Sequence, residues 1–93
     1  MTVRYRVRAL RDIDAIYKYL HEQSPRGASN VLQAIHAAIN LIAKQPYGSP
    51  RVEAQGIRVK VVRRYPYKIF YRLADEDQII VLHIRHASRR PWP

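Results

Sequence analysis

The stretch "YKIFYRLADEDQIIVLHIRH" at residues 67–86 decides the fold. Residues 67–73 place Tyr67, Ile69, Tyr71 and Leu73 at every second position, which is the period of a strand with one buried face. The acidic "ADED" at 74–77 predicts a turn. The apolar run at 78–86 predicts a strand that is central in its sheet. The stretch therefore predicts two antiparallel strands, with Tyr67 and Tyr71 in the core.

Two further strands are predicted on either side of a helical region. The segment "IRVKVV" at 57–62 places Ile57, Val59 and Val61 on one face and Arg58 and Lys60 on the other, and "RRYP" then forms a turn. The opening "VRYRV" at 3–7 alternates apolar and basic residues in the same way. Four strands in this order can build one small sheet.

The residues between the first two strands have the period of helices. A first apolar stripe contains Leu10, Ile13, Ile16, Tyr17 and Leu20, and Asp12 and Asp14 are expected near the positive N-terminal end of that helix. Ser24 and Pro25 indicate the cap and first turn of a second helix, which should end near Lys44 before "QPYGSP". Its stripe contains Ala28, Val31, Leu32, Ile35, Ala38, Ile39 and Ile42. The short connection predicts an antiparallel helical hairpin.

These elements predict an α+β fold in the order β-α-α-β-β-β. We expect a single domain over residues 1–93, with the N-terminal strand and the helical hairpin packed on one face of a small antiparallel sheet. The opposite face is then basic and partly apolar, and a contiguous patch of that kind indicates a partner. The residues expected on it are Arg58, Lys60, Val62, Lys68, Phe70, Arg72, Ile79, Val81, His83 and Arg85.

The composition is strongly basic. Seventeen Lys and Arg residues, thirteen of them Arg, oppose seven Asp and Glu residues, which gives a formal net charge of +10. Such a charge indicates a polyanionic or acidic partner. The absence of cysteine excludes disulfides and thiolate metal sites and fits the cytoplasm. We expect no signal peptide, because "MTVRYRVRAL" has no apolar run after its charges, and no membrane span, because no stretch approaches the roughly 20 apolar residues that cross a bilayer. We expect no metal site, because His21 and His36 lack acidic or His neighbours at metal-ligand spacing, and no cofactor.

Three segments together resemble the RelE/ParE superfamily of toxins from type II toxin–antitoxin pairs. They are "RDIDAIYKYL", "PRGASNVLQAIHAAINLIAKQP" and "YKIFYRLADEDQIIVLHIRHASRRP", and the resemblance covers nearly the whole chain. It implies a cytoplasmic toxin in a hetero-oligomer with a cognate antitoxin that wraps it. RelE-like members cut messenger RNA on the ribosome, whereas ParE-like members inhibit DNA gyrase.

The chemistry of RNA cleavage separates these two branches. Cleavage through the 2′-hydroxyl needs a base, an acid and cations around the phosphate. The candidates for a nuclease are Lys60, Lys68, Arg72 and His86, although His86 can equally be a structural residue at a strand end. Trp92 stands where the resemblance implies a C-terminal tyrosine, and it cannot transfer a proton. The ending "RHASRRP" resembles the ParE-like branch instead, in which no catalytic residues are needed.

The sequence therefore predicts a ParE-like gyrase inhibitor, with a ribosome-dependent mRNA interferase as the alternative. A member that retains only antitoxin binding and autoregulation is a third hypothesis. The expected antitoxin-binding residues are Arg58, Lys60, Phe70, Arg72, Val81 and His83. The expected target-binding residues are Arg63, Arg64, Arg85, His86, Arg89, Arg90 and Trp92.

Overall fold

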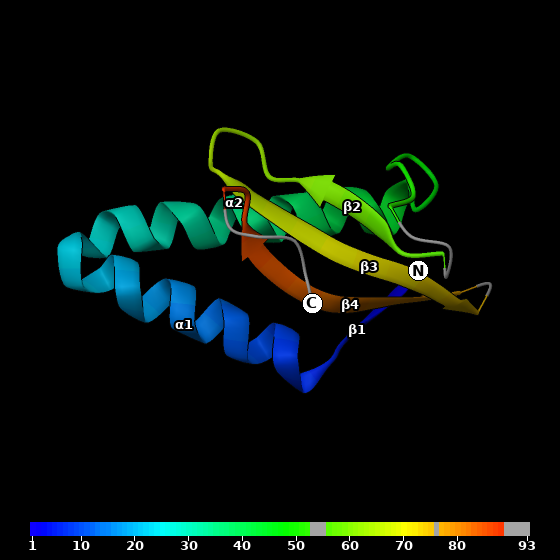
Figure 1. Ribbon diagram of the computed structural model, residues 1–93, viewed down its shortest axis with the longest axis horizontal. Coiled ribbons are helices and arrows are strands. Elements are labelled where there is room, and N and C mark those ends of the chain that lie inside the picture. The colour runs from blue at the N-terminus through cyan, green and yellow to red at the C-terminus, as the bar shows by residue number, and fades with distance from the viewer. Residues whose placement is uncertain (53–55, 76, 89–93) are drawn as a thin grey trace.

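A computed structural model describes residues 1–52, 56–75 and 77–88 and confirms the order β-α-α-β-β-β. The elements are β1 (Thr2–Tyr5), α1 (Val7–Gln23), α2 (Pro25–Lys44), β2 (Arg58–Val61), β3 (Tyr67–Asp75) and β4 (Gln78–His86). The two helices form an antiparallel hairpin that covers one face of the sheet (Figure 1). Neither helix of the described chain is long and apolar enough to cross a membrane.

The four strands lie in the order β1-β4-β3-β2, so β4 is internal as predicted. β3 is antiparallel to both β2 and β4, whereas β1 is parallel to β4. The sheet is therefore mixed and not wholly antiparallel. Parallel neighbours need a long connection, and the helical hairpin between β1 and the later strands provides one.

The helix α2 follows its sequence pattern closely. The Ser24 hydroxyl accepts a hydrogen bond from the Gly27 backbone N–H at 3.0 Å, and Pro25 opens the first turn. The buried stripe contains Ala28, Val31, Ile35, Ala38, Ile39 and Ile42. The cap satisfies one of the backbone donors that a helix start leaves open, which fixes where α2 begins.

The helix α1 departs from the prediction at its start. It begins at Val7, and its fully buried residue is Ala9, while Leu10 is 52% exposed. Asp12 and Asp14 consequently lie beyond the first turn, which contains no acidic residue. Asp14 instead pairs with Lys18 across 3.0 Å on the exposed side. The small Ala9 brings α1 close to the sheet, which a leucine at the same place would prevent.

The core lies between the helices and the sheet. Ile69, Tyr71, Ile79 and Val81 contribute side chains with 0% exposure, and Tyr67 is 7% exposed. Both tyrosines are therefore core residues, as predicted. The Tyr71 hydroxyl donates a hydrogen bond to the Pro46 carbonyl oxygen at 2.8 Å, so the polar end of this buried ring has an acceptor.

A β-bulge in β4 changes which residues face the helices. Phe70 pairs with His83, but Tyr71 pairs with Val81, so Leu82 is an extra residue in β4. An extra residue reverses the alternation of side chains beyond it. Ile79 and Val81 therefore belong to the core, and the prediction that they share the opposite face with His83 is wrong.

The register of β2 reverses its predicted faces as well. Arg58 pairs with Tyr71 and Lys60 with Ile69, so both basic residues are on the helix side of the sheet. Val61 shares the other face with Lys68 and is 60% exposed, whereas Val62, just after the strand, is 1% exposed. Alternation gives the period of a strand but not its absolute side. At the sheet edge, long basic side chains reach water from either face.

Candidate functional site

The sheet face that carries no helix is the first candidate surface, and we call it the open face. Strand pairing places Lys68 beside Arg85, Phe70 beside His83 and Arg72 beside Ile80. Lys68, Phe70 and Arg72 are all half-buried. The open face therefore combines cations with aromatic and aliphatic surface, the mixture predicted from the sequence.

His83 is a buried part of this face. Its side chain is 0% exposed, and its ring lies against Phe70 with 4.8 Å between the ring centroids. Burial and the positive charges of Arg8 and Arg85 together lower the pKa of His83 to about 4. His83 is thus a neutral structural residue at pH 7. A role in direct contact with an antitoxin does not fit this burial.

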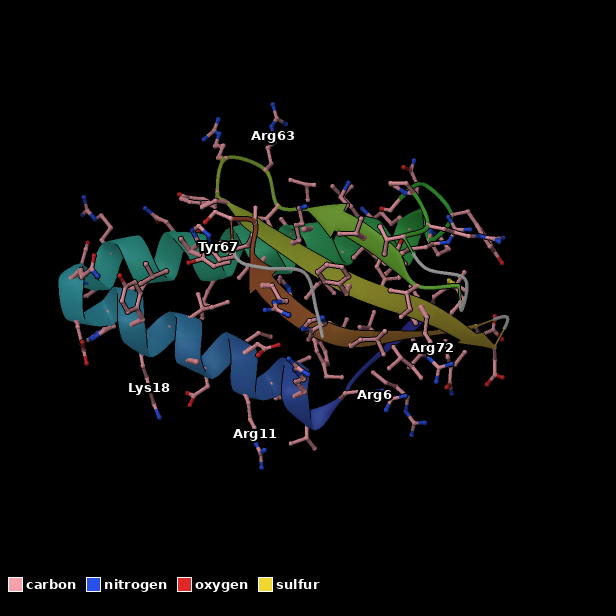
Figure 2. The ribbon with its side chains drawn as sticks, in the orientation of Figure 1. Arg6, Arg11, Lys18, Arg63, Tyr67 and Arg72 are labelled. Carbon is pink, nitrogen blue, oxygen red and sulfur yellow. The ribbon has the colours of Figure 1, made fainter. Side chains whose placement is uncertain are left out.

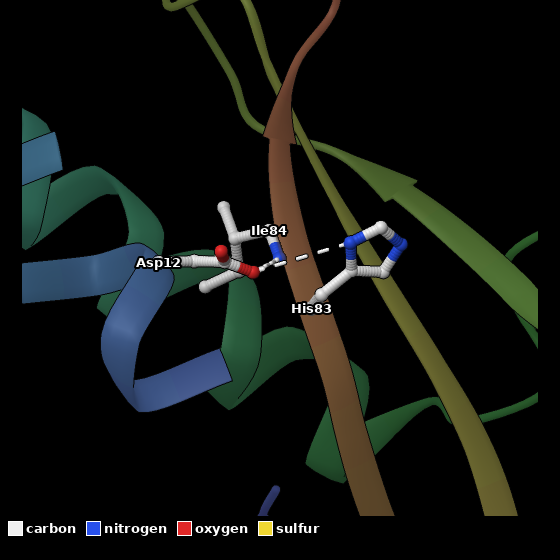
Figure 3. Close-up of polar contacts among 3 residues, drawn as sticks. All are labelled: Asp12, His83 and Ile84. Carbon is white, nitrogen blue, oxygen red and sulfur yellow. Dashed lines mark hydrogen bonds and ion pairs between the residues drawn. The ribbon is translucent and has the colours of Figure 1, made fainter. Parts of the chain in front are cut away.

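Asp12 provides a hydrogen-bond acceptor for the backbone of β4 next to His83 (Figure 3). Its carboxylate accepts a hydrogen bond from the Ile84 backbone N–H at 2.9 Å, and the same oxygen lies 4.0 Å from His83 Nδ1. β1 ends at Tyr5, opposite Val81, so it cannot supply this acceptor. The sequence analysis missed this role. The sequence did contain a signal, because Asp12 lies four residues before Ile16 and therefore on the apolar stripe of α1.

The four nuclease candidates do not converge on one surface. Lys60 is on the helix side of the sheet, whereas Lys68 and Arg72 are on the open face. His86 pairs with the core residue Tyr67, and their rings meet edge to face at 5.4 Å. The Nδ1 atom of His86 is 2.7 Å from the Ser88 hydroxyl. An acid–base pair and its cations must surround one phosphate, and this arrangement does not place them around a common point.

The predicted antitoxin-binding residues are also divided. Phe70 and Arg72 are on the open face, and Val81 is in the core because of the bulge. Arg58 turns toward the loop after α2, where it donates a hydrogen bond to the Ser49 carbonyl at 2.6 Å. Its guanidinium also lies over the Tyr47 ring, 5.2 Å from the centroid. These contacts make Arg58 a residue that stabilises the loop.

The predicted target-binding residues gather at one end of the sheet where they are described. Arg63 and Arg64 are exposed on the turn between β2 and β3, and Arg64 has a left-handed backbone with φ of 75°. The end of β4 lies against this turn, because the Ala87 N–H donates to the Pro66 carbonyl at 2.6 Å. Arg85 and His86 therefore lie nearby. Arg89, Arg90 and Trp92 lie outside the described residues.

Metal-binding geometry is absent from the part of the chain that the structure describes. No group of three or more His, Cys, Asp or Glu residues lies close enough there to hold a metal ion. The arrangement can bind an acidic or polyanionic partner through its cations.

Comparison with known families decides the identity. The family described as ParE toxin of type II toxin–antitoxin system, parDE, matches residues 3–91. The chain belongs to the ParE toxin family. The Y4kP protein of Sinorhizobium fredii (strain NBRC 101917 / NGR234), whose name describes a candidate toxin, is 30% identical over 91 residues. That match covers 98% of this chain and 92% of Y4kP.

Solved structures of related systems share the fold of this ParE family member. A chain of the chromosomal ParDE toxin–antitoxin system from P. aeruginosa has a TM-score of 0.78 and 26% identity, covering 95% of this chain and 97% of that one. A chain of the RelBE2 toxin–antitoxin complex from Mycobacterium tuberculosis has a TM-score of 0.58 and 25% identity, with coverage of 91% and 95%. The resemblance to the RelE/ParE superfamily, and to its ParE-like branch, is confirmed.

Proposed function

We propose that this ParE family toxin inhibits DNA gyrase by binding it, without a catalytic site of its own. The observation that carries the proposal is the separation of Lys60 from Lys68 and Arg72 by the sheet. A ribosome-dependent nuclease would need these cations and His86 around one phosphate. A toxin that acts by binding has no such requirement. Gyrase is a cytoplasmic enzyme, so we propose the cytoplasm as the site of action.

The basic end of the sheet is the proposed gyrase-binding surface. Arg85 and His86 lie there at the end of β4, next to the turn between β2 and β3. The sequence prediction adds Arg89, Arg90 and Trp92 to this surface. Cations at this end of the sheet suit an acidic protein surface or the DNA that gyrase holds.

The first experiment measures which synthesis stops when the toxin is induced alone. DNA and protein synthesis are followed by pulse-labelling in the first minutes after induction. The proposal expects DNA synthesis to fall first, together with a DNA-damage response. It also expects Lys60→Ala combined with Lys68→Ala to remain toxic, because neither residue belongs to the proposed gyrase-binding surface. An early fall in protein synthesis with cleaved messenger RNA would establish the nuclease alternative.

We also propose that a cognate antitoxin neutralises the toxin by covering the open face in a hetero-oligomer. Both solved relatives come from toxin–antitoxin systems. The half-buried Phe70 and Arg72 supply apolar area beside charge, which suits an acidic segment that folds on binding. Purified toxin with Phe70→Ala and Arg72→Glu should bind the antitoxin encoded beside it more weakly. An unchanged dissociation constant would exclude the open face as the antitoxin site.

A further inference from the structure

The start of the chain has an arginine at every second position. Arg4 lies in β1, Arg6 follows that strand, and Arg8 lies in the first turn of α1. All three residues are exposed, and we call them the arginine band. They belong neither to the core nor to the residues predicted to contact the antitoxin or the target. The fold and the proposed function therefore leave these charges unexplained.

Strand pairing places the arginine band along the open face. Arg4 pairs with Ile80, and Ile80 also pairs with Arg72, so the three residues form one row across β1, β4 and β3. The backbone remains extended at Arg6, so alternation places this side chain on the same side as Arg4. Tyr5 stands between the two arginines and is on the helix side of the sheet.

The band continues into the cleft between α1 and the end of β4. Arg8 and Arg85 line this cleft together, and the charges of both act on the ring of His83. Among the described residues that line the cleft, Asp12 is the acidic one, and its carboxylate accepts a hydrogen bond from the backbone of β4. Positive charge therefore extends along the β1 side of β4, from Arg4 to Arg85.

The local structure does not favour arginine at these positions. The N-cap of α1 is Arg6, which makes no capping hydrogen bond through its side chain, and the first turn contains no acidic residue. Ser, Thr, Asp and Asn stabilise a helix start, whereas positive charges there oppose the helix dipole. The helix α2 follows this rule with Ser24. The departure from it in α1 indicates charges that serve binding and not folding.

We propose that the arginine band binds the phosphate backbone of duplex DNA without reading its sequence. Guanidinium groups form forked hydrogen bonds with phosphate oxygens, and a duplex presents one negative charge per about 1.7 Å of its axis. A protein interface usually has a centre that is depleted of charge, whereas the band is a row of cations. Sites for single strands interleave cations with aromatic rings, but Tyr5 lies on the other face.

This inference goes beyond the proposed function and does not depend on it. The toxin would contact DNA directly, whether gyrase or the ribosome is its target. Binding to naked DNA tests the arginine band, whereas pulse-labelling in cells tests gyrase as the target. The two proposals can therefore fail separately.

The test measures binding of the full-length toxin to a fluorescently labelled DNA duplex of arbitrary sequence. Fluorescence anisotropy gives the dissociation constant at a series of salt concentrations. The band variant combines Arg4→Gln, Arg6→Gln and Arg8→Gln. A second variant, Arg4→Gln with Arg6→Gln, leaves Arg8 in place in case its loss disturbs α1. Circular dichroism establishes that each variant is folded.

The control variant removes the same charge at three exposed arginines outside the band. It combines Arg11→Gln, Arg26→Gln and Arg51→Gln. Figure 2 shows Arg11 pointing away from the sheet, although it is only three residues from Arg8 in the sequence. The control therefore separates the position of the charges from their number.

The dependence of affinity on salt counts the phosphate contacts, because each contact adds about 0.9 to the slope of log affinity against log salt concentration. The band variant should bind the duplex about tenfold more weakly or worse, and its slope should fall by about 2 to 3. The double variant should lose about two thirds of that slope change, and the control should change little.

Three results would overturn the inference. Equal losses in the band variant and the control would mean that net charge alone attracts DNA. Tighter binding of a single strand than of the duplex would exclude a duplex site. A band variant that keeps its DNA affinity but loses affinity for DNA-free gyrase would assign the band to an acidic protein surface.

Discussion

Acidification should destabilise this protein through His83 before most carboxylates titrate. The pKa of His83 is about 4 in the folded chain, against about 6.5 for an unperturbed histidine. The folded state therefore stays neutral at this ring while the unfolded chain takes up a proton. The stability that His83 confers is fully present above pH 6.5 and is lost as the pH falls toward 4. Linkage predicts a loss of about 2 kcal/mol between about pH 7.5 and about pH 5.

The assay is urea unfolding at a series of pH values, followed by tyrosine fluorescence or circular dichroism. His83→Leu removes the titrating ring and should flatten the dependence of the unfolding free energy on pH in this range. The substitution also alters packing against Phe70, so the slope and not the absolute stability is the measured quantity. His36→Gln, which removes an exposed histidine from α2, is the matched control. A His83→Leu protein with the wild-type slope would refute the argument that burial keeps this ring neutral.

Two further predictions test the sheet. Asp12→Ala should lower the free energy of unfolding by about 1–3 kcal/mol, because the buried Ile84 N–H loses its acceptor. Asp12→Asn should restore part of this loss. Thermal unfolding measures both variants, with Asp14→Ala at an exposed position as the control. Val81→Ala should cost about 2 kcal/mol, whereas Val61→Ala should cost little, since their exposures are 0% and 60%. A loss in urea unfolding for Val81→Ala as small as the loss for Val61→Ala would contradict the bulge at Leu82.

The sequence predicted those parts of the fold that depend on local signals. The cap at Ser24 and the prolines around α2 set the limits of that helix, and the apolar run at 78–86 matches β4 residue for residue. These signals are strong because capping and hydrophobic period act within a few residues. The central position of β4 followed from its apolar character alone.

The sequence could not predict features that depend on how strands meet. The bulge at Leu82 exists only relative to β3, and it moves Val81 from the open face to the core. The side on which Arg58 and Lys60 lie is set by pairing with β3. The predicted antitoxin-binding set contains the same errors. Alternation alone placed its residues on one surface, whereas the structure divides them between the two faces of the sheet and the core. The partner of Asp12 is likewise distant in sequence: the place of Asp12 on the apolar stripe of α1 indicates burial, but it does not identify Ile84 as the group that Asp12 binds.

The parallel pairing of β1 with β4 also determines when the sheet can form during synthesis of the chain. Thr2 pairs with Gln78, so β1 can join the sheet only after β4 has been synthesised. β4 also joins β1 to the rest of the sheet. A nascent chain that stops before Gln78 therefore lacks the strand that connects β1 with β3. Any activity that needs the complete sheet therefore requires synthesis of the chain through β4.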